Sequence, residues 1–275
     1  MENSKIFNTV TIIGMGLIGS SICRAAKHFA VANKIIVYDK DPYVLRKVRD
    51  LKIADIVCKD LNESVSESDL VFIATPVGSI PSLVEEISGC LKKNAILTDT
   101  GSVKGSLYKF FEENIFEDIN IIPSHPVAGT ENSGPEYGFQ ELFLDRWCIF
   151  TPLPSASKKS IEDLKSLWTR FGSKVETMDP DHHDLILAIT SHLPHLISYN
   201  IVGLANDIEK IKESEVIKYS AGGFRDFTRI ASSDPIMWRD IFLNNKDAVI
   251  EVLARFIDDL SALQKAIHLN DGEFL

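Results

Sequence analysis

His125 is the residue of this sequence best placed for acid–base chemistry. It lies between Pro123 and Pro126, which lack a backbone N–H and hold φ at about −65°. The residue before each proline is restricted to extended geometry. Just upstream, Ile121 and Ile122 predict a short buried strand. The sequence therefore predicts a rigid loop that presents one imidazole beyond the carboxyl end of a strand. The alternative is a buried histidine that is hydrogen-bonded to its own loop.

A glycine-rich turn indicates a second chemistry, the binding of phosphates. The β-branched run Thr9–Ile13 predicts a buried strand. It leads into Gly14, Gly16 and Gly19 of a G-x-G-x-x-G motif, and a helical pattern follows. A strand, this motif and a helix in that order predict a dinucleotide site. The pyrophosphate would face the first N–H groups of the helix, which places Leu17 and Ile18 with the glycines as cofactor-binding residues.

Asp39 ends the next predicted strand, Lys34–Tyr38, and follows Gly19 by 20 residues. A carboxylate at this distance is expected to bind the ribose hydroxyls of the cofactor. It would repel a 2′-phosphate and so favours NAD over NADP, although Lys40 and Arg46 could offset that repulsion. The alternative is that Asp39 caps the following helix.

Two further turns are expected at the same edge of the sheet. Leu70–Ala74 predicts a central strand that ends at Thr75 and Pro76, which we expect to line the cofactor site. Ala95–Thr98 predicts the next strand, and Ser102 follows it. Ser102 would lie near the nicotinamide, or it would be the N-cap of the next helix.

The second half of the sequence is helical. The segment Asp184–Ala205 is long and apolar enough to suggest a membrane span, but His192, Pro194 and His195 interrupt it. We expect a buried helix instead, kinked at Pro194 and covered in part by a second copy of the chain. The two histidines share a helix face. They could bind an anionic substrate or be satisfied core residues, and we expect no metal.

A cationic segment follows at Ala221–Ala231, where Arg225, Asp226 and Arg229 lie among apolar residues. We expect one arginine to lie against a buried wall, where it would need an anion. The alternative is a purely structural pair of Arg229 with Asp226.

Composition and length limit the possible functions. The 275 residues carry a net charge of −10, which argues against a nucleic-acid or anionic-membrane partner. The four cysteines are scattered and the N-terminus shows no signal peptide, so we expect a cytoplasmic protein. We predict an α/β Rossmann-type doubly wound parallel sheet over residues 1–153, ending with strand Trp147–Thr151. An all-α substrate and dimerisation domain would follow over residues 154–275.

Several of these segments resemble the prephenate/arogenate (cyclohexadienyl) dehydrogenase family. The most specific are His-Pro-Val-Ala-Gly-Thr-Glu at 125–131 and Gly-Gly-Phe-Arg-Asp-Phe-Thr-Arg at 222–229. The glycine motif, Asp99–Gly105 and Ser191–His195 also match, so the resemblance covers nearly the whole chain. It implies NAD-dependent oxidative decarboxylation of prephenate or arogenate, with hydride loss from ring carbon 4, in tyrosine biosynthesis. From the apolar helices of the second half we also expect a homodimer formed through the helical domain.

The resemblance further implies roles for individual residues. His125 matches the family's proton acceptor, and Ser102 matches the serine that hydrogen-bonds the substrate hydroxyl and that histidine. Arg229 matches the arginine that holds a substrate carboxylate, and Asp226 matches an aspartate that approaches the partner's site. Four other positions match residues of the substrate pocket or its mouth: His192, His195, Thr130 and Glu131.

Two other functions stay open. A β-hydroxyacid or imine-reducing dehydrogenase has the same two kinds of domain but usually places a catalytic lysine in the helical half. No lysine lies between Asp179 and Asn206 of this sequence. A non-catalytic dinucleotide sensor would have no need of Ser102, His125 and Arg229 together.

Overall fold

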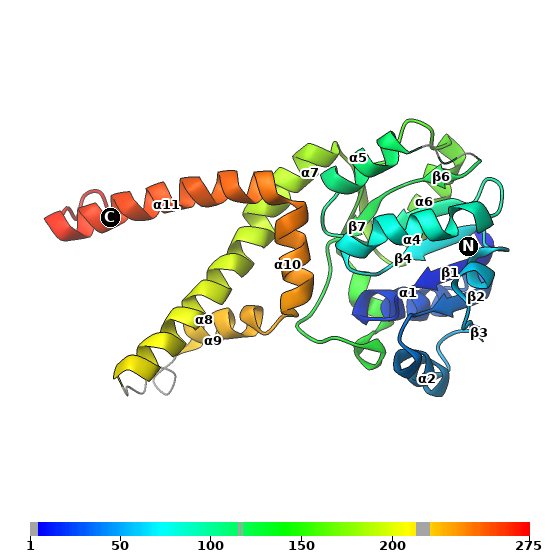
Figure 1. Ribbon diagram of the computed structural model, residues 1–275, viewed down its shortest axis with the longest axis horizontal. Helices are drawn as coiled ribbons and strands as arrows, with labels where there is room; N and C mark the ends of the chain where they lie inside the picture. Colours follow the sequence, from blue (N-terminus) through cyan, green and yellow to red (C-terminus); the bar gives the residue numbers. More distant parts are fainter. Residues whose placement is uncertain (1–4, 115, 117, 213–220) are drawn as a thin grey trace. The chain divides into compact units, whose positions relative to one another are not determined.

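The computed structural model describes residues 5–114, 116, 118–212 and 221–275. The first four residues, part of the segment in which no signal peptide was found, lie outside this range. The chain divides into two compact units, Met1–His183 and Asp184–Leu275 (Figure 1).

The first unit is built around a parallel six-stranded sheet with the order β3-β2-β1-β4-β5-β6. This is the doubly wound order of dinucleotide-binding domains, so the predicted fold class is confirmed. The strands are β1 (Phe7–Ile13), β2 (Ala32–Tyr38), β3 (Ile56–Val57), β4 (Leu70–Ile73), β5 (Ile96–Asp99) and β6 (Asn120–Ile121). In the register, Ile13 pairs with Tyr38 and Ile73, and Ile73 pairs with Asp99. The carboxyl ends of four strands therefore form one row.

Helices with apolar stripes connect these strands. They are α1 (Leu17–His28), α2 (Pro42–Leu51), α3 (Leu61–Val65), α4 (Ile80–Ile87) and α5 (Gly105–Glu113). The side chain of Asp41 caps α2 by accepting from the N–H of Tyr43 at 2.8 Å, so the alternative in which Asp39 is the cap is wrong.

On the inner side of α1, the thiol of Cys23 donates to the carbonyl of Ile53 at 3.2 Å. Burial is the main cause that raises the pKa of this thiol to about 12.

A second sheet of three strands, in the order β7-β8-β9, corrects the expected layout. The strands are β7 (Ser124–Pro126), β8 (Trp147–Phe150) and β9 (Lys174–Thr177). His125 therefore lies in a short strand antiparallel to β8, and the prediction of an irregular loop was wrong. The extended geometry required before each proline also suits a strand, and Pro126 lies at the strand's end, where its missing N–H costs little.

The first unit extends further along the chain than expected, because residues 154–183 pack with it. Helix α6 (Lys158–Arg170) contributes Trp168, which is fully buried, with its ring 5.9 Å from Phe72 and 5.1 Å from Phe143. Strand β9 pairs in parallel with β8. The boundary expected after residue 153 therefore lies about one helix and one strand before the boundary between the two compact units. The prolines at 152 and 154 mark a turn within the first unit.

Asp179 caps helix α7 (Pro180–Leu187), because its Oδ1 accepts from the N–H groups of Asp181 and His182 at 3.0 Å. A π-helical turn follows at Ala188–His192, and α8 (Leu193–Lys212) begins directly after it. The kink expected at Pro194 stays a prediction, but the backbone hydrogen bonding does change just before this proline. Proline has no N–H to donate to the carbonyl four residues back. Just before it, the N–H of Leu193 donates to the carbonyl of Ala188, five residues back, which is the π-helical pattern.

The remaining elements of the second unit are α9 (Gly222–Ala231), α10 (Pro235–Asn244) and α11 (Lys246–Leu269). Gly222 and Gly223 are the first two residues of α9. Asp234 caps α10 by accepting from the N–H groups of Ile236 and Met237.

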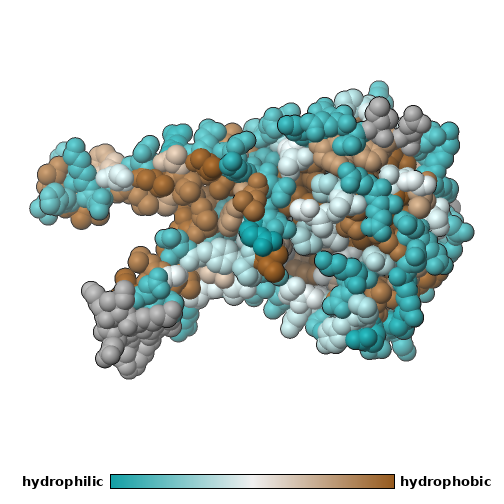
Figure 2. Space-filling model, viewed as in Figure 1, coloured by the Kyte–Doolittle hydropathy of each residue, from teal (hydrophilic) through white to brown (hydrophobic). Residues whose placement is uncertain are grey.

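Large apolar side chains remain exposed on the second unit. The continuous helical segment Pro180–Ile208 is long and apolar enough to cross a membrane, with a mean hydropathy of 1.3, and 28% of its most apolar window is buried within this chain. Figure 2 shows brown, hydrophobic residues along α11 between teal ones. The exposed apolar residues of α11 include Ile250, Ile257, Leu260, Leu263 and Ile267. Their spacing of three, four and seven residues indicates one apolar face.

Candidate active site

The glycine turn after β1 has the geometry that a dinucleotide requires. Gly14 has φ +91°, and a Cβ there would lie 2.7 Å from the carbonyl oxygen of Ala74. A Cβ on Gly19 would lie 1.9 Å from the carbonyl oxygen of Gly14, whereas one on Gly16 would meet nothing within 4 Å. Gly14 and Gly19 are needed for packing, and Gly16 leaves an open face for a pyrophosphate.

The N-terminus of α1 fits the same ligand. Among the described residues no side chain caps this helix, so the N–H groups of its first turn, with Leu17 and Ile18, can bind phosphate oxygens.

Asp39 is fixed at the end of β2, beside the glycine turn. Its Oδ2 accepts from the N–H of Met15 at 2.7 Å, and its Oδ1 accepts from the N–H of Asp41 at 2.9 Å. A methyl carbon of Thr75 would lie 2.8 Å from a Cβ on Gly14, so Thr75 borders the turn, with Pro76 next to it. All of these predicted cofactor residues lie at one edge of the sheet.

A buried polar network joins the end of β5 to the strand that carries His125. Lys104, fully buried, forms an ion pair with Asp99 and donates to the carbonyl of Ser124 at 2.9 Å. Asp99 also accepts from the N–H of Gly101 at 2.7 Å and from the N–H of Ser124 at 3.3 Å. Because Ser124 directly precedes His125, this network fixes the backbone position from which the imidazole side chain extends.

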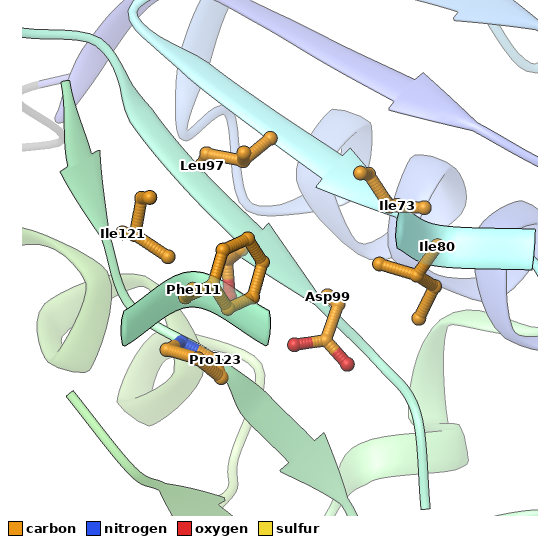
Figure 3. A pocket seen from close by; sticks show the side chains of 8 residues that line it. Ile73, Ile80, Leu97, Asp99, Phe111, Ile121 and Pro123 are labelled. Carbon is orange, nitrogen blue, oxygen red and sulfur yellow. The ribbon is translucent and has the colours of Figure 1, made fainter. Parts of the chain in front are cut away.

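The surroundings of Asp99 explain why it needs a cation. Figure 3 shows its carboxylate beside a small hollow whose other labelled side chains are apolar. The lining residues are Ile73, Ile80, Leu97, Thr98, Phe111, Ile121 and Pro123. A carboxylate in such an environment is stable when it is paired and hydrogen-bonded, and Lys104 with two backbone N–H groups meets that need.

His125 is 7% exposed, and its Nδ1 lies 2.9 Å from Nε2 of His183, which is fully buried. The ring centroids are 5.1 Å apart at an angle of 70°. The open alternative of the sequence was a histidine satisfied by its own loop, but its partner here is a side chain of α7, 58 residues away.

Ser102 lies half-buried in the turn after β5. The alternative that it caps the next helix is wrong, because α5 begins at Gly105 and its N-cap is Lys104. Next to Ser102, a Cβ on Gly101 would lie 3.5 Å from a methyl carbon of Val77. Ser102 is therefore in the turn between the Thr75–Pro76 rim and the Asp99 network.

Thr130 and Glu131 follow β7 on an exposed segment. The hydroxyl of Thr130 accepts from the N–H of Asn132 at 3.3 Å. Both side chains lie five and six residues beyond His125 and are open to solvent in this chain.

His192, in the π-helical turn of the second unit, is fully buried. Asn245 Nδ2 lies 2.8 Å from the carbonyl oxygen of Asp184 and 3.0 Å from His192 Nδ1. An amide nitrogen only donates, so Nδ1 of His192 accepts and its ring proton is on Nε2.

His195 lies one turn further on and stacks on Trp238, with the ring centroids 3.6 Å apart. Its Nδ1 lies 2.9 Å from the carbonyl oxygen of Ser191; a carbonyl only accepts, so Nδ1 carries the proton. Burial and, more weakly, the positive charge of Arg229 lower the pKa of His195, against the opposing effect of the Ser191 carbonyl. His195 thus offers a neutral ring close to a guanidinium.

Arg229 is a positive group of this region, and its acidic contact among the described residues is weak. Its Nη2 lies 3.6 Å from Oδ1 of Asp226, with side-chain exposures of 56% and 75%. Arg225 is also exposed. Contrary to the expectation from the sequence, neither arginine therefore lies against a buried apolar surface within one chain. An exposed pair at this distance contributes little to stability, which leaves the guanidinium able to bind an anion.

The described residues contain no group of three or more His, Cys, Asp or Glu side chains that could hold a metal ion. Sequence reasoning gave no role to His183, the Asp99–Lys104 pair, or Trp238. The adjacent histidines at 182 and 183 were a usable signal, since successive helical residues point about 100° apart and one of the two can face the core while the other is exposed. Nothing in the sequence indicates that Lys104 reaches Ser124.

The nucleotide-binding edge, the buried histidine and the helical second unit together define a two-domain dehydrogenase that uses NAD. The family model for the nucleotide-binding domain of prephenate dehydrogenase matches residues 22–177, and that for its dimerization domain matches residues 179–275. The chain belongs to the prephenate dehydrogenase family.

Individual relatives agree with this membership. Cyclohexadienyl dehydrogenase of Zymomonas mobilis is 42% identical over 270 residues, which are 98% of this chain and 92% of the relative. Prephenate dehydrogenase of Bacillus subtilis is 31% identical over 99% of this chain and 73% of its own length. The crystal structure of Aquifex aeolicus prephenate dehydrogenase with hydroxyphenyl propionate and NAD⁺ aligns with a TM-score of 0.90 at 35% identity, covering 98% and 93% of the two chains.

Proposed function

We propose that this enzyme oxidises and decarboxylates prephenate, or its amino counterpart arogenate, in the biosynthesis of tyrosine. The observation that carries the proposal is the position of His125. Its buried imidazole, in contact with His183, follows Ser124, whose N–H donates to Asp99 at the edge of the sheet that holds the nucleotide turn. Gly14–Gly19 would hold NAD, which would supply the acceptor for the hydride of ring carbon 4 of the substrate. The carboxylate of Asp39 supports a preference for NAD over NADP.

In this mechanism His125 acts through Nε2, because its Nδ1 faces His183. Nε2 takes the proton of the hydroxyl on carbon 4 as the hydride leaves that carbon. The ring carboxylate then departs as carbon dioxide, and the electron pair of the broken bond completes the aromatic ring. The proton returns to the phenolic oxygen. Ser102 would donate a hydrogen bond to the same oxygen and orient it.

The substrate carries carboxylates, and the chain as a whole carries a net charge of −10, so local cations must bind it. We assign this role to Arg229, with His192 and His195 as neutral polar neighbours. Glu131, with Thr130 beside it, would favour the ammonium group of arogenate over the keto group of prephenate. Asp226 would approach the substrate site of the partner subunit in the proposed dimer.

We further propose a homodimer formed by the apolar faces of the second unit, and a cytoplasmic location. The match of residues 179–275 to a dimerization domain supports the dimer. The four cysteines are free thiols, which suits a reducing compartment.

The test of His125 is a kinetic comparison with the variant His125→Asn, which keeps a polar side chain but removes the base. We expect kcat to fall about 10²- to 10⁴-fold, with the NAD dissociation constant unchanged. Initial rates of NADH formation with prephenate and arogenate, each with NAD and NADP, measure the loss and the preferences. An active His125→Asn variant would remove this residue from the mechanism, and a wild type without activity on either substrate would refute the function.

Arg229 is tested by Arg229→Ala. We expect KM for the substrate to rise about 10- to 100-fold, the range that corresponds to a charge-assisted hydrogen bond of roughly 1.5–3 kcal/mol. Thermal unfolding should change little, because the Asp226 contact is weak. Unfolding at a much lower temperature without a change in KM would instead favour the structural pairing.

A further inference from the structure

The partner of His125 is a residue to which no role has been given. His183 is the fourth residue of α7, fully buried, and its Nε2 lies 2.9 Å from Nδ1 of His125. Its backbone N–H donates to the carbonyl of Asp179 at 2.9 Å. The side chain of Asp179 caps the same helix, so the start of α7 is held in place and His183 with it.

The contact between the two rings requires one proton and can take only two forms. In one, Nδ1–H of His125 donates to a bare Nε2 of His183. In the other, Nε2–H of His183 donates to a bare Nδ1 of His125. A neutral imidazole carries one proton, so the first form leaves Nε2 of His125 bare and the second leaves it protonated. Only the first form can accept a proton from a substrate at Nε2.

We propose that His183 is a positioning residue that holds His125 in the tautomer with a protonated Nδ1. The inference rests on the proposed role of His125 as proton acceptor. When His125 takes the substrate proton, its Nδ1–H becomes the donor of a charge-assisted hydrogen bond to His183, and such bonds are about twice as strong as neutral ones. His183 therefore orients the ring before the reaction and stabilises its charged form during the reaction, without touching the substrate.

The environment of the pair suits this role. Both rings are buried, so water does not compete for Nδ1. The rings come from different elements, β7 and α7, and each element is fixed independently, β7 by the Lys104–Asp99 network and α7 by its cap. A ring that is held from both sides loses little rotational freedom on reaching the reactive geometry, and misplacement of a catalytic group by about 1 Å can cost roughly 10²-fold in rate.

The experiment compares His183→Leu with His183→Gln. Leucine fills the space but accepts no hydrogen bond, whereas the glutamine side chain ends in an oxygen that can accept one where Nε2 was. His182 provides the matched control, because it is the adjacent histidine and is exposed. We expect His183→Leu to lower kcat about 10- to 100-fold with KM and the NAD dissociation constant within about twofold. His183→Gln should recover most of kcat, and His182→Gln should match the wild type.

A second measurement reports the tautomer directly. In protein labelled with ¹⁵N-histidine, the two ring nitrogens of His125, assigned by comparison with His125→Asn, should show a protonated Nδ1 and a bare Nε2. The same ring in His183→Leu should show a mixture of tautomers.

Three results would overturn the inference: a bare Nδ1 in the wild type, full kcat in His183→Leu, or a His183→Gln variant no better than His183→Leu. These differ from failure of the proposed function, which would show as an inactive wild type or an active His125→Asn. Thermal unfolding of each variant separates a loss of fold from a loss of orientation, since only the latter lowers kcat in protein that remains folded.

Discussion

At the scale of single residues, the stacked His195 shows how the second unit prepares a neutral ring. The ring is held between the indole of Trp238 and the carbonyl of Ser191. Burial penalises the charged form, and Arg229 adds positive charge nearby. The result is a histidine that stays neutral under conditions in which an exposed one begins to take up a proton.

This shift predicts a pH dependence of stability. The folded-state pKa of His195 lies below its ordinary value of 6.5. As the pH falls through 6.5, the unfolded chain therefore binds a proton at this residue before the folded chain does. The free energy of unfolding must then decrease with falling pH, until the lower folded-state pKa is reached. His195→Gln should lose less stability than the wild type between pH 7 and pH 5.

Urea unfolding across this range measures the effect, with the exposed His268→Gln as control. Equal pH slopes for His195→Gln and the wild type would show that the ring is not penalised by burial.

At the scale of elements, the turn after β5 and the strand β7 depend on one buried ion pair. Lys104 contacts both the Asp99 carboxylate and the Ser124 carbonyl. Removing the cation leaves an unpaired carboxylate in an apolar setting. We therefore expect Lys104→Met to lower the free energy of unfolding by about 3–5 kcal/mol.

The matched control for this element is Lys109→Met, one turn along α5, where the lysine is 76% exposed and lies 3.9 Å from Glu113. That variant should unfold like the wild type in denaturant titrations. If Lys104→Met were equally stable, the ion pair would be dispensable and the position of His125 would have to depend on other contacts.

The elements also show what the sequence could and could not predict. Apolar runs bounded by turns identified five of the six parallel strands, and the glycine motif located the cofactor edge, because both signals are local. The pairing of β7 with β8 and of β8 with β9 was missed, since each pairing joins segments more than 20 residues apart that have no shared pattern. His183 was missed for the same reason: its partner is set by the tertiary fold. His125, Ser102 and Arg229 were singled out through a family resemblance, and their roles stay predictions.

At the scale of the whole molecule, the exposed apolar face of α11 is the feature that a single chain leaves unexplained. Ile257 and Leu260 are 51% and 47% exposed. Leu260→Glu places a charge in this face and should convert a dimer into a monomer, because burying an unpaired carboxylate in an apolar interface is costly. Ala262→Glu adds the same charge about 200° around the helix and should leave the proposed dimer intact.

Sedimentation velocity at micromolar concentration measures the molar mass of both variants. A Leu260→Glu protein that sediments as the wild type does would exclude this face from the interface. Loss of the dimer in both variants would mean that α11 is enclosed on every side.

The buried thiol of Cys23 gives the nucleotide domain a built-in reporter. With its pKa near 12, almost none of it is ionised at neutral pH, and only the thiolate attacks alkylating reagents. Cys23 is also fully buried, so we expect its covalent labelling to require local opening around α1. A nucleotide bound at the amino end of that helix would hold it closed, so the labelling rate would record occupancy of the cofactor site without any turnover.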